Sequence, residues 1–131
     1  MTRDEVILTA VQWWSDKLAS RAPHSNGDNS SASVLACMFA DIGSKELTRI
    51  QLSLFEGFLT SKLQSLYDQE IVKWKSSSFS IGCDYGPCSE LIYAAENAEI
   101  NLLNFPFKTW MRIGKDYVEV SDGYGKPWVR I

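Results

Sequence analysis

The sequence lacks any apolar run close to the ~20 consecutive residues that a membrane-spanning helix needs. It also lacks the start of a secretion signal, because Asp4 and Glu5 stand where such a signal has basic residues and then an apolar stretch. We therefore expect a protein that stays in the cytoplasm and has no membrane partner.

Neither sign of charge is in strong excess. Thirteen Lys and Arg residues stand against sixteen Asp and Glu residues, which gives a net charge of -3 at pH 7. That charge is too mild for a nucleic-acid mimic and has the wrong sign for a general binder of nucleic-acid duplexes. With 45% hydrophobic residues and five tryptophans, the chain can bury a core, so disorder is excluded for most of it.

Cysteine and histidine are scarce. The three cysteines (Cys37, Cys83 and Cys88) and the single histidine (His24) could formally make one zinc site. Two tight ligand pairs are missing, however, and Cys37 lies among apolar residues that are typical of a core. We therefore expect reduced thiols, no metal and no cofactor.

Catalytic motifs are also missing. Cys88 follows a turn and lies near a predicted helix start, where a thiolate would be stabilised. A nucleophile also needs a positioned base, and the only histidine lies in a polar segment. No glycine-framed serine or useful pair of acids is present. We expect that the protein is not an enzyme.

Helical signals dominate the first half. Thr2 with Glu5, and Thr48 with Gln51, form capping boxes that start two long amphipathic helices. A shorter apolar repeat lies between them, after a polar, turn-forming stretch. The predicted helices cover residues 3–20, 34–42 and about 49–74. The apolar stripe of the third helix, together with the first helix, favours a dimer surface.

The second half alternates in the manner of strands. Strands are predicted at 79–83, 105–113, 117–121 and 128–131, with a helix that starts at Pro87 and stops near Asn101. Gly114-Lys115 and Asp122-Gly123 are predicted to be hairpin turns. The fold class is therefore α+β, with N-terminal helices followed by a C-terminal antiparallel β-meander. We expect a single domain over 1–131, with a helical part at 1–75 and a mixed part at 76–131.

Three residues of the strand at 105–113 could form a binding face. Lys108, Trp110 and Arg112 share one side by the period-two rule, so two cations would flank an indole. Such a surface can hold phosphates and stack a base. The alternative is a solvated face on which long side chains cover a tryptophan.

Two turns could contribute to the same site. The segment 82–88 leads from a strand into a helix start, which is a weak anion-binding signal. Asp84 there is predicted to cap the helix, which leaves Tyr85 to line a pocket. In the turn-rich segment 122–128, Tyr124 could either pack or bind a ligand, whereas Trp128 is expected in the core.

The residues at 84–87, at 105–109 and at 123–125 with Pro127 resemble small proteins of phages and prophages in gut Firmicutes. The order of helices and sheet resembles the Thoeris anti-defense family of signal-sequestering sponges. That resemblance implies an oligomer that traps a cyclic nucleotide made by a TIR or cyclase defense enzyme, without turnover.

The resemblance also implies roles for individual residues. Lys108, Thr109 and Arg112 would contact the phosphates and sugar, and Tyr85 or Trp110 would stack on a base. Asp122 would accept a hydrogen bond from a ribose hydroxyl. The alternative function is direct inhibition of a bacterial defense effector, as anti-CRISPR proteins do, because mild acidity and many aromatics also suit a protein interface.

Overall fold

The computed structural model describes residues 1–20, 47–123 and 125–131. The predicted helix at 34–42, His24, Cys37 and Tyr124 lie outside the described residues. The elements, in chain order, are the helix α1 (Arg3–Ser20), the helix α3 (Arg49–Tyr67), the π-helical segment η1 (Asp68–Lys73), β1 (Ser78–Cys83), the helix α4 (Ser89–Asn97), the 3₁₀ turn η2 (Leu102–Asn104), β2 (Thr109–Gly114), β3 (Val118–Ser121) and β4 (Val129–Arg130).

The two long helices begin where the capping boxes predict. Thr48 accepts a hydrogen bond from the backbone N–H of Gln51 at 3.1 Å, and its own N–H donates to the Gln51 side chain at 3.0 Å. The same exchange joins Thr2 and Glu5 at the start of α1. Side-chain caps satisfy backbone donors that the first helical turn leaves without partners. Local sequence therefore fixes both helix starts.

The structure confirms that the chain is helical over nearly all of the predicted range 49–74, but the last turns are π-helical rather than α-helical. After Tyr67 the chain continues as the π-helical segment η1, and the Trp74 N–H donates to the Gln69 carbonyl at 2.9 Å. The α1 helix runs antiparallel to this rod, since Arg3 pairs with Asp68 at 2.8 Å near its far end.

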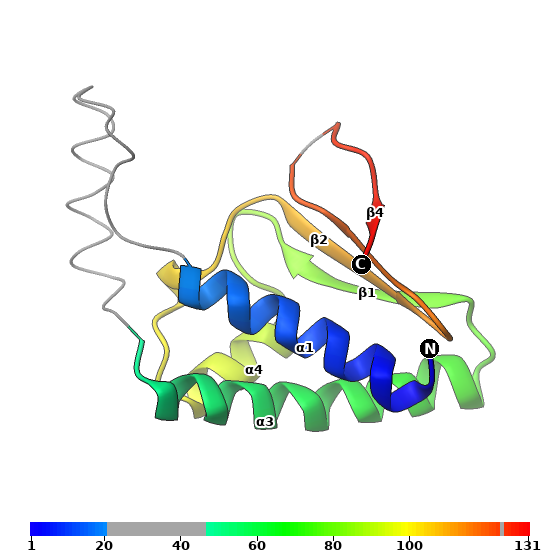
Figure 1. Cartoon of the computed structure of the whole chain (residues 1–131), viewed down its shortest axis with the longest axis horizontal. Coiled ribbons are helices and arrows are strands. Elements are labelled where there is room, and N and C mark those ends of the chain that lie inside the picture. The colour runs from blue at the N-terminus through cyan, green and yellow to red at the C-terminus, as the bar shows by residue number, and fades with distance from the viewer. Residues whose placement is uncertain (21–46, 124) are drawn as a thin grey trace.

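The strands form one antiparallel sheet in the order β1-β2-β3-β4, which confirms the predicted α+β class. Figure 1 shows α1, α3 and α4 gathered on one side of this sheet. Alternate β2 residues, Thr109, Met111 and Ile113, are buried on the side toward the helices. The opposite side carries Trp110 and Arg112, and no described helix covers it.

Several predicted boundaries are wrong. The strand expected from Phe105 begins only at Thr109, since Lys108 has a left-handed backbone with φ of 54°. The β2–β3 turn is centred on residues 115–116 rather than 114–115, because Gly114 pairs with Tyr117. Asp122-Gly123 is not a two-residue hairpin turn, because the last printed pair of β3 and β4 is Val120 with Val129.

The helix α4 also differs from its prediction. It begins at Ser89, two residues after Pro87, and ends at Asn97. Its N-cap residue is Cys88, which makes no side-chain cap, so the predicted capping role of Asp84 is wrong. The helix therefore begins later than Pro87 predicts, and Cys88 still has an extended backbone.

The apolar stripe of α3 lies inside the chain. Phe55, Leu59, Leu63 and Tyr67 are buried in the core, where α3 packs against α1 and α4. This stripe is therefore no argument for a second copy, and the oligomeric state stays a prediction.

The cap of α3 gives a test of this fold. Thr48→Ala removes the acceptor for the Gln51 N–H, so unfolding should become easier by about 1 kcal/mol. The matched control is Ser53→Ala, at an exposed position inside the same helix, where alanine should be neutral or slightly stabilising. Urea unfolding followed by circular dichroism measures both, and equal stabilities would show that the cap contributes nothing.

Candidate functional site

The uncovered side of the sheet carries a row of charges across three strands. Arg112 of β2 pairs in register with Glu119 of β3, which pairs in turn with Arg130 of β4. Directly opposed residues of an antiparallel sheet point to the same side. The row therefore places a carboxylate between two guanidinium groups.

Arg112 is held by two neighbours. Its guanidinium carbon lies 4.2 Å from the centre of the Trp128 ring. Its Nη1 lies 3.6 Å from Oε1 of Glu119, and its side chain is 37% exposed. The stack on Trp128 fixes the plane of the guanidinium, while the exposed remainder can still donate hydrogen bonds to a ligand.

A second stacked arginine lies beside it. Arg130 lies 4.5 Å from the centre of the Tyr117 ring. The Tyr117 ring in turn lies over Gly114, because a Cβ at Gly114 would lie 2.2 Å from a Tyr117 ring atom. The two guanidinium groups of this face are thus both oriented by aromatic rings.

Trp110 also rests on a glycine. A Cβ at Gly82 would lie 2.5 Å from Cε3 of Trp110, so the indole packs closely against the backbone of β1. This contact leaves the ring half-buried. The sequence alone predicts the alternation of Trp110 with its neighbours, but it gives no sign of the glycine beneath it.

Two predicted site residues form a separate corner. Lys108 Nζ lies 5.4 Å from the centre of the Tyr85 ring, and the Lys108 N–H donates to the Asp84 carbonyl at 2.8 Å. The structure thus brings Lys108 to Tyr85, before the strand begins, while Arg112 stacks on Trp128.

The remaining predicted site residues lie elsewhere. Thr109 is buried on the helix side, and its hydroxyl donates to the Phe107 carbonyl at 3.0 Å, so it cannot contact a ligand on the outer face. Asp122 lies 3.9 Å from Nζ of Lys17 and 4.0 Å from Nζ of Lys126.

Sequence reasoning missed four members of this face. These are Tyr117, Glu119, Trp128 and Arg130. The alternation of β3 and β4 could have placed the first, second and fourth there, because opposed strands share faces. Trp128 was expected in the core, yet it is 38% exposed and covers Arg112.

Cys88 shows the opposite of the electrostatics that a nucleophile needs. Burial raises the pKa of its thiol, although hydrogen bonds from the backbone of Gly82 and Leu91 act in the lowering direction. A raised pKa leaves less thiolate at neutral pH. The geometry at this helix start therefore supplies no activated cysteine.

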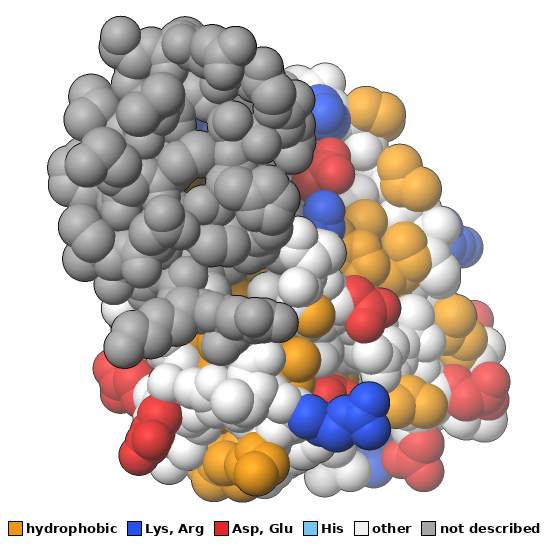
Figure 2. Space-filling model, turned by 60° about the vertical axis from the view of Figure 1, so that its left-hand side comes forward, with side chains coloured by type: hydrophobic (Ala, Val, Ile, Leu, Met, Phe, Trp, Pro, Cys, Tyr) orange, Lys and Arg blue, Asp and Glu red, His pale blue; other side chains and the backbone are white. Residues whose placement is uncertain are grey.

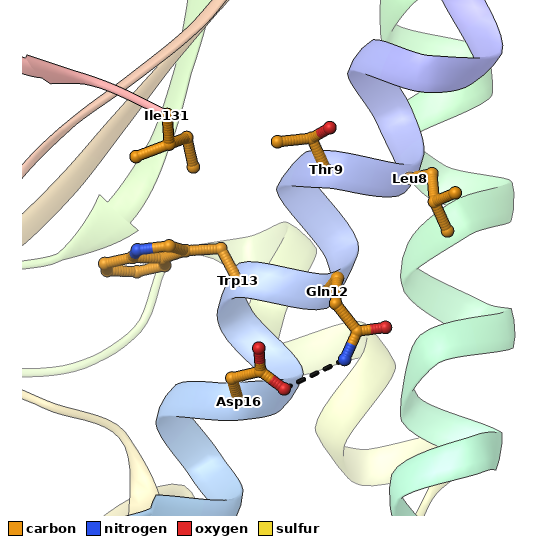
Figure 3. A pocket seen from close by; sticks show the side chains of 6 residues that line it. All are labelled: Leu8, Thr9, Gln12, Trp13, Asp16 and Ile131. Atoms are coloured by element: carbon orange, nitrogen blue, oxygen red, sulfur yellow. Dashed lines mark hydrogen bonds between the residues drawn. The ribbon is translucent and has the colours of Figure 1, made fainter.

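Two hollows lie away from the sheet face. One, of about 390 Å³, lies between α1 and the end of β4 and is lined by Leu8, Thr9, Gln12, Trp13, Asp16 and Ile131. Figure 3 shows the Trp13 ring beneath Ile131, with Gln12 hydrogen-bonded to Asp16 at 2.9 Å. The other, of about 460 Å³, lies where η1 meets the β2–β3 turn.

Charges of both signs are spread over the surface. On the side shown in Figure 2, outside the grey residues, hydrophobic, basic and acidic side chains alternate without an extended patch of one charge. None of the described helices has the length and apolar character needed to cross a bilayer.

The close approach of β1 and β2 at Gly82 gives a test. In Gly82→Ala the new methyl group would meet the Thr109 carbonyl oxygen as well as the indole, so the strands must shift. We expect a loss of about 1–3 kcal/mol of stability and an altered tryptophan emission. Gly86→Ala is the control, because nothing lies within 4 Å of its Cβ position. Thermal unfolding measures the stability of both variants, and an equal change in the two would contradict this packing.

Comparison of the sequence with models of known protein families and with curated proteins finds no match.

Proposed function

We propose that this protein binds and sequesters a cyclic nucleotide immune signal without catalysis, as an anti-defense sponge does. The observation that carries the proposal is the pair of arginines on the uncovered sheet face, each stacked on an aromatic ring. The ligand's phosphates would lie on Arg112 and Arg130, and a base would stack beside them on Trp110 or Trp128.

The chemistry of the face suits such a ligand. A guanidinium donates two parallel hydrogen bonds to a phosphate, and its stacking on a ring reduces the entropy lost on binding. Indole rings offer a face to any base, so base stacking needs no particular hydrogen-bond pattern. Two guanidinium groups against one carboxylate leave the row with a net positive charge.

Glu119 limits how strongly the face attracts phosphates. Its carboxylate already pairs with Arg112 at 3.6 Å, so an incoming phosphate must compete with it. A single contact of that length between partly exposed groups is weak. Glu119 can also accept a hydrogen bond from a ribose hydroxyl, the role that the family resemblance implies for Asp122.

Arginine replacement tests the proposal. Arg112→Ala should weaken binding of a cyclic dinucleotide or cyclic ADP-ribose about tenfold, the low end for a charged hydrogen bond, because Glu119 already competes. Arg112→Lys should recover only part of the affinity, because lysine keeps the charge but loses the fork and the stack. Isothermal titration at two salt concentrations measures both variants.

The matched control is Lys62→Ala. Lys62 lies 4.8 Å from the centre of the Tyr93 ring, so it is also a cation over a tyrosine, but it belongs to α3. Its replacement should leave the affinity unchanged. A parent protein that binds none of these nucleotides, or an Arg112→Ala variant that binds as tightly as the parent, would exclude this function for the sheet face.

Direct inhibition of a bacterial defense protein is the second candidate. The sheet face is rich in Trp, Tyr and Arg, the residues that dominate protein interfaces. A host effector that co-purifies with the parent, but not with Trp128→Ala, would favour inhibition over sequestration.

A further inference from the structure

The hollow of about 460 Å³ has the chemistry of a separate anion site. It is lined by Tyr67, Ile71, Val72, Lys75, Ser76, Ser77 and Lys115. Its volume falls in the range of small-molecule sites. Its lining contains two lysines and two serines but no carboxylate.

The two lysines come from different parts of the chain. Lys75 follows the end of η1, and Lys115 lies in the turn between β2 and β3. A lysine that ends a helix is expected, because it offsets the partial negative charge of the last carbonyls. That reason does not apply to Lys115, which the fold brings to the same hollow from the sheet.

Neither lysine is neutralised by a described carboxylate. Among residues 1–20, 47–123 and 125–131, no Asp or Glu oxygen lies within 4.0 Å of Nζ of Lys75 or Lys115. Asp68 pairs with Arg3 at 2.8 Å, and Glu70 accepts a hydrogen bond from Ser76 at 3.2 Å. Burial raises the pKa of Tyr67, and the carboxylate of Asp116 raises it further, so Asp116 also lies near the hollow.

The floor of the hollow is apolar and fixed in place. The Tyr67 hydroxyl donates to the Lys115 carbonyl at 2.7 Å, which ties the β2–β3 turn to the end of α3. Ile71 is buried, and Val72 is half-exposed. A ligand with an apolar or aromatic body can therefore pack on this floor while its charged end lies between the lysines.

We propose that this hollow binds a small phosphate monoester. The phosphate lies between Lys75 and Lys115 and accepts a hydrogen bond from the Ser77 hydroxyl, and the apolar part of the ester packs on Ile71 and Val72. The site shares no residue with the charged row on the sheet, so it does not depend on the function proposed for the sheet face.

Phenyl phosphate and inorganic phosphate are the probes, and amide chemical shifts in nuclear magnetic resonance are the readout. Phenyl phosphate should give saturable shifts at Ser76, Ser77 and Lys115 and should bind more tightly than inorganic phosphate. Lys75→Gln and Lys115→Gln should each weaken its binding up to about fivefold, which corresponds to an exposed ion pair.

Lys73→Gln is the matched control, because it removes the same charge from the same helix end at a residue outside the lining. It should leave the affinity unchanged. The proposal is overturned by the lack of saturable shifts at concentrations on the order of 10 mM, near the weakest affinity that such a site would have. It is also overturned if Lys73→Gln weakens binding as much as Lys115→Gln, or if inorganic phosphate binds as tightly as the ester.

Discussion

An aromatic cluster at the centre of the molecule determines which side of the sheet is left open. Trp14 of α1 and Phe55 of α3 both meet Phe105, with ring centres 6.3 Å and 6.0 Å apart. All three side chains are fully buried. Because Phe105 lies shortly before β2, this cluster fixes both helices against one side of the sheet, and the charged row is left on the other side.

The cluster includes a buried polar atom that none of the described residues satisfies. Nε1 of Trp14 is buried and has no hydrogen-bond partner within residues 1–20, 47–123 and 125–131. A buried donor without a partner typically costs about 1–3 kcal/mol, which the packing of the large indole must exceed. The position therefore favours tryptophan for its shape rather than for its N–H group.

Local signals predicted the helices well and the sheet less well. The capping boxes at Thr2 and Thr48 place the helix starts, because capping depends on residues three apart in sequence. The choice of neighbouring strands decides that Glu119 lies between Arg112 and Arg130, and that Trp110 packs on Gly82. Residue spacing within one strand carries no information on which strands pair.

The expected site was therefore predicted only in part. The period-two rule correctly placed Trp110 and Arg112 on the side opposite Met111. The rule failed for Lys108, because β2 begins only at the next residue, Thr109. The backbone of Lys108 is left-handed, and its side chain lies near Tyr85. The ligand role of Thr109 came from the family resemblance, whereas the period-two rule sets Thr109 on the side opposite Trp110 and Arg112, where it is buried.

The proposed function depends on ligand binding by the uncovered sheet face. Mass spectrometry of small molecules released by heating the purified protein tests this most directly. Protein produced in cells that make the immune signal should release about one nucleotide per binding site. The variant Trp128→Ala, which removes the ring that stacks on Arg112, should release much less. The contradictory result would be a folded parent protein that releases no nucleotide, or a Trp128→Ala variant that releases as much as the parent.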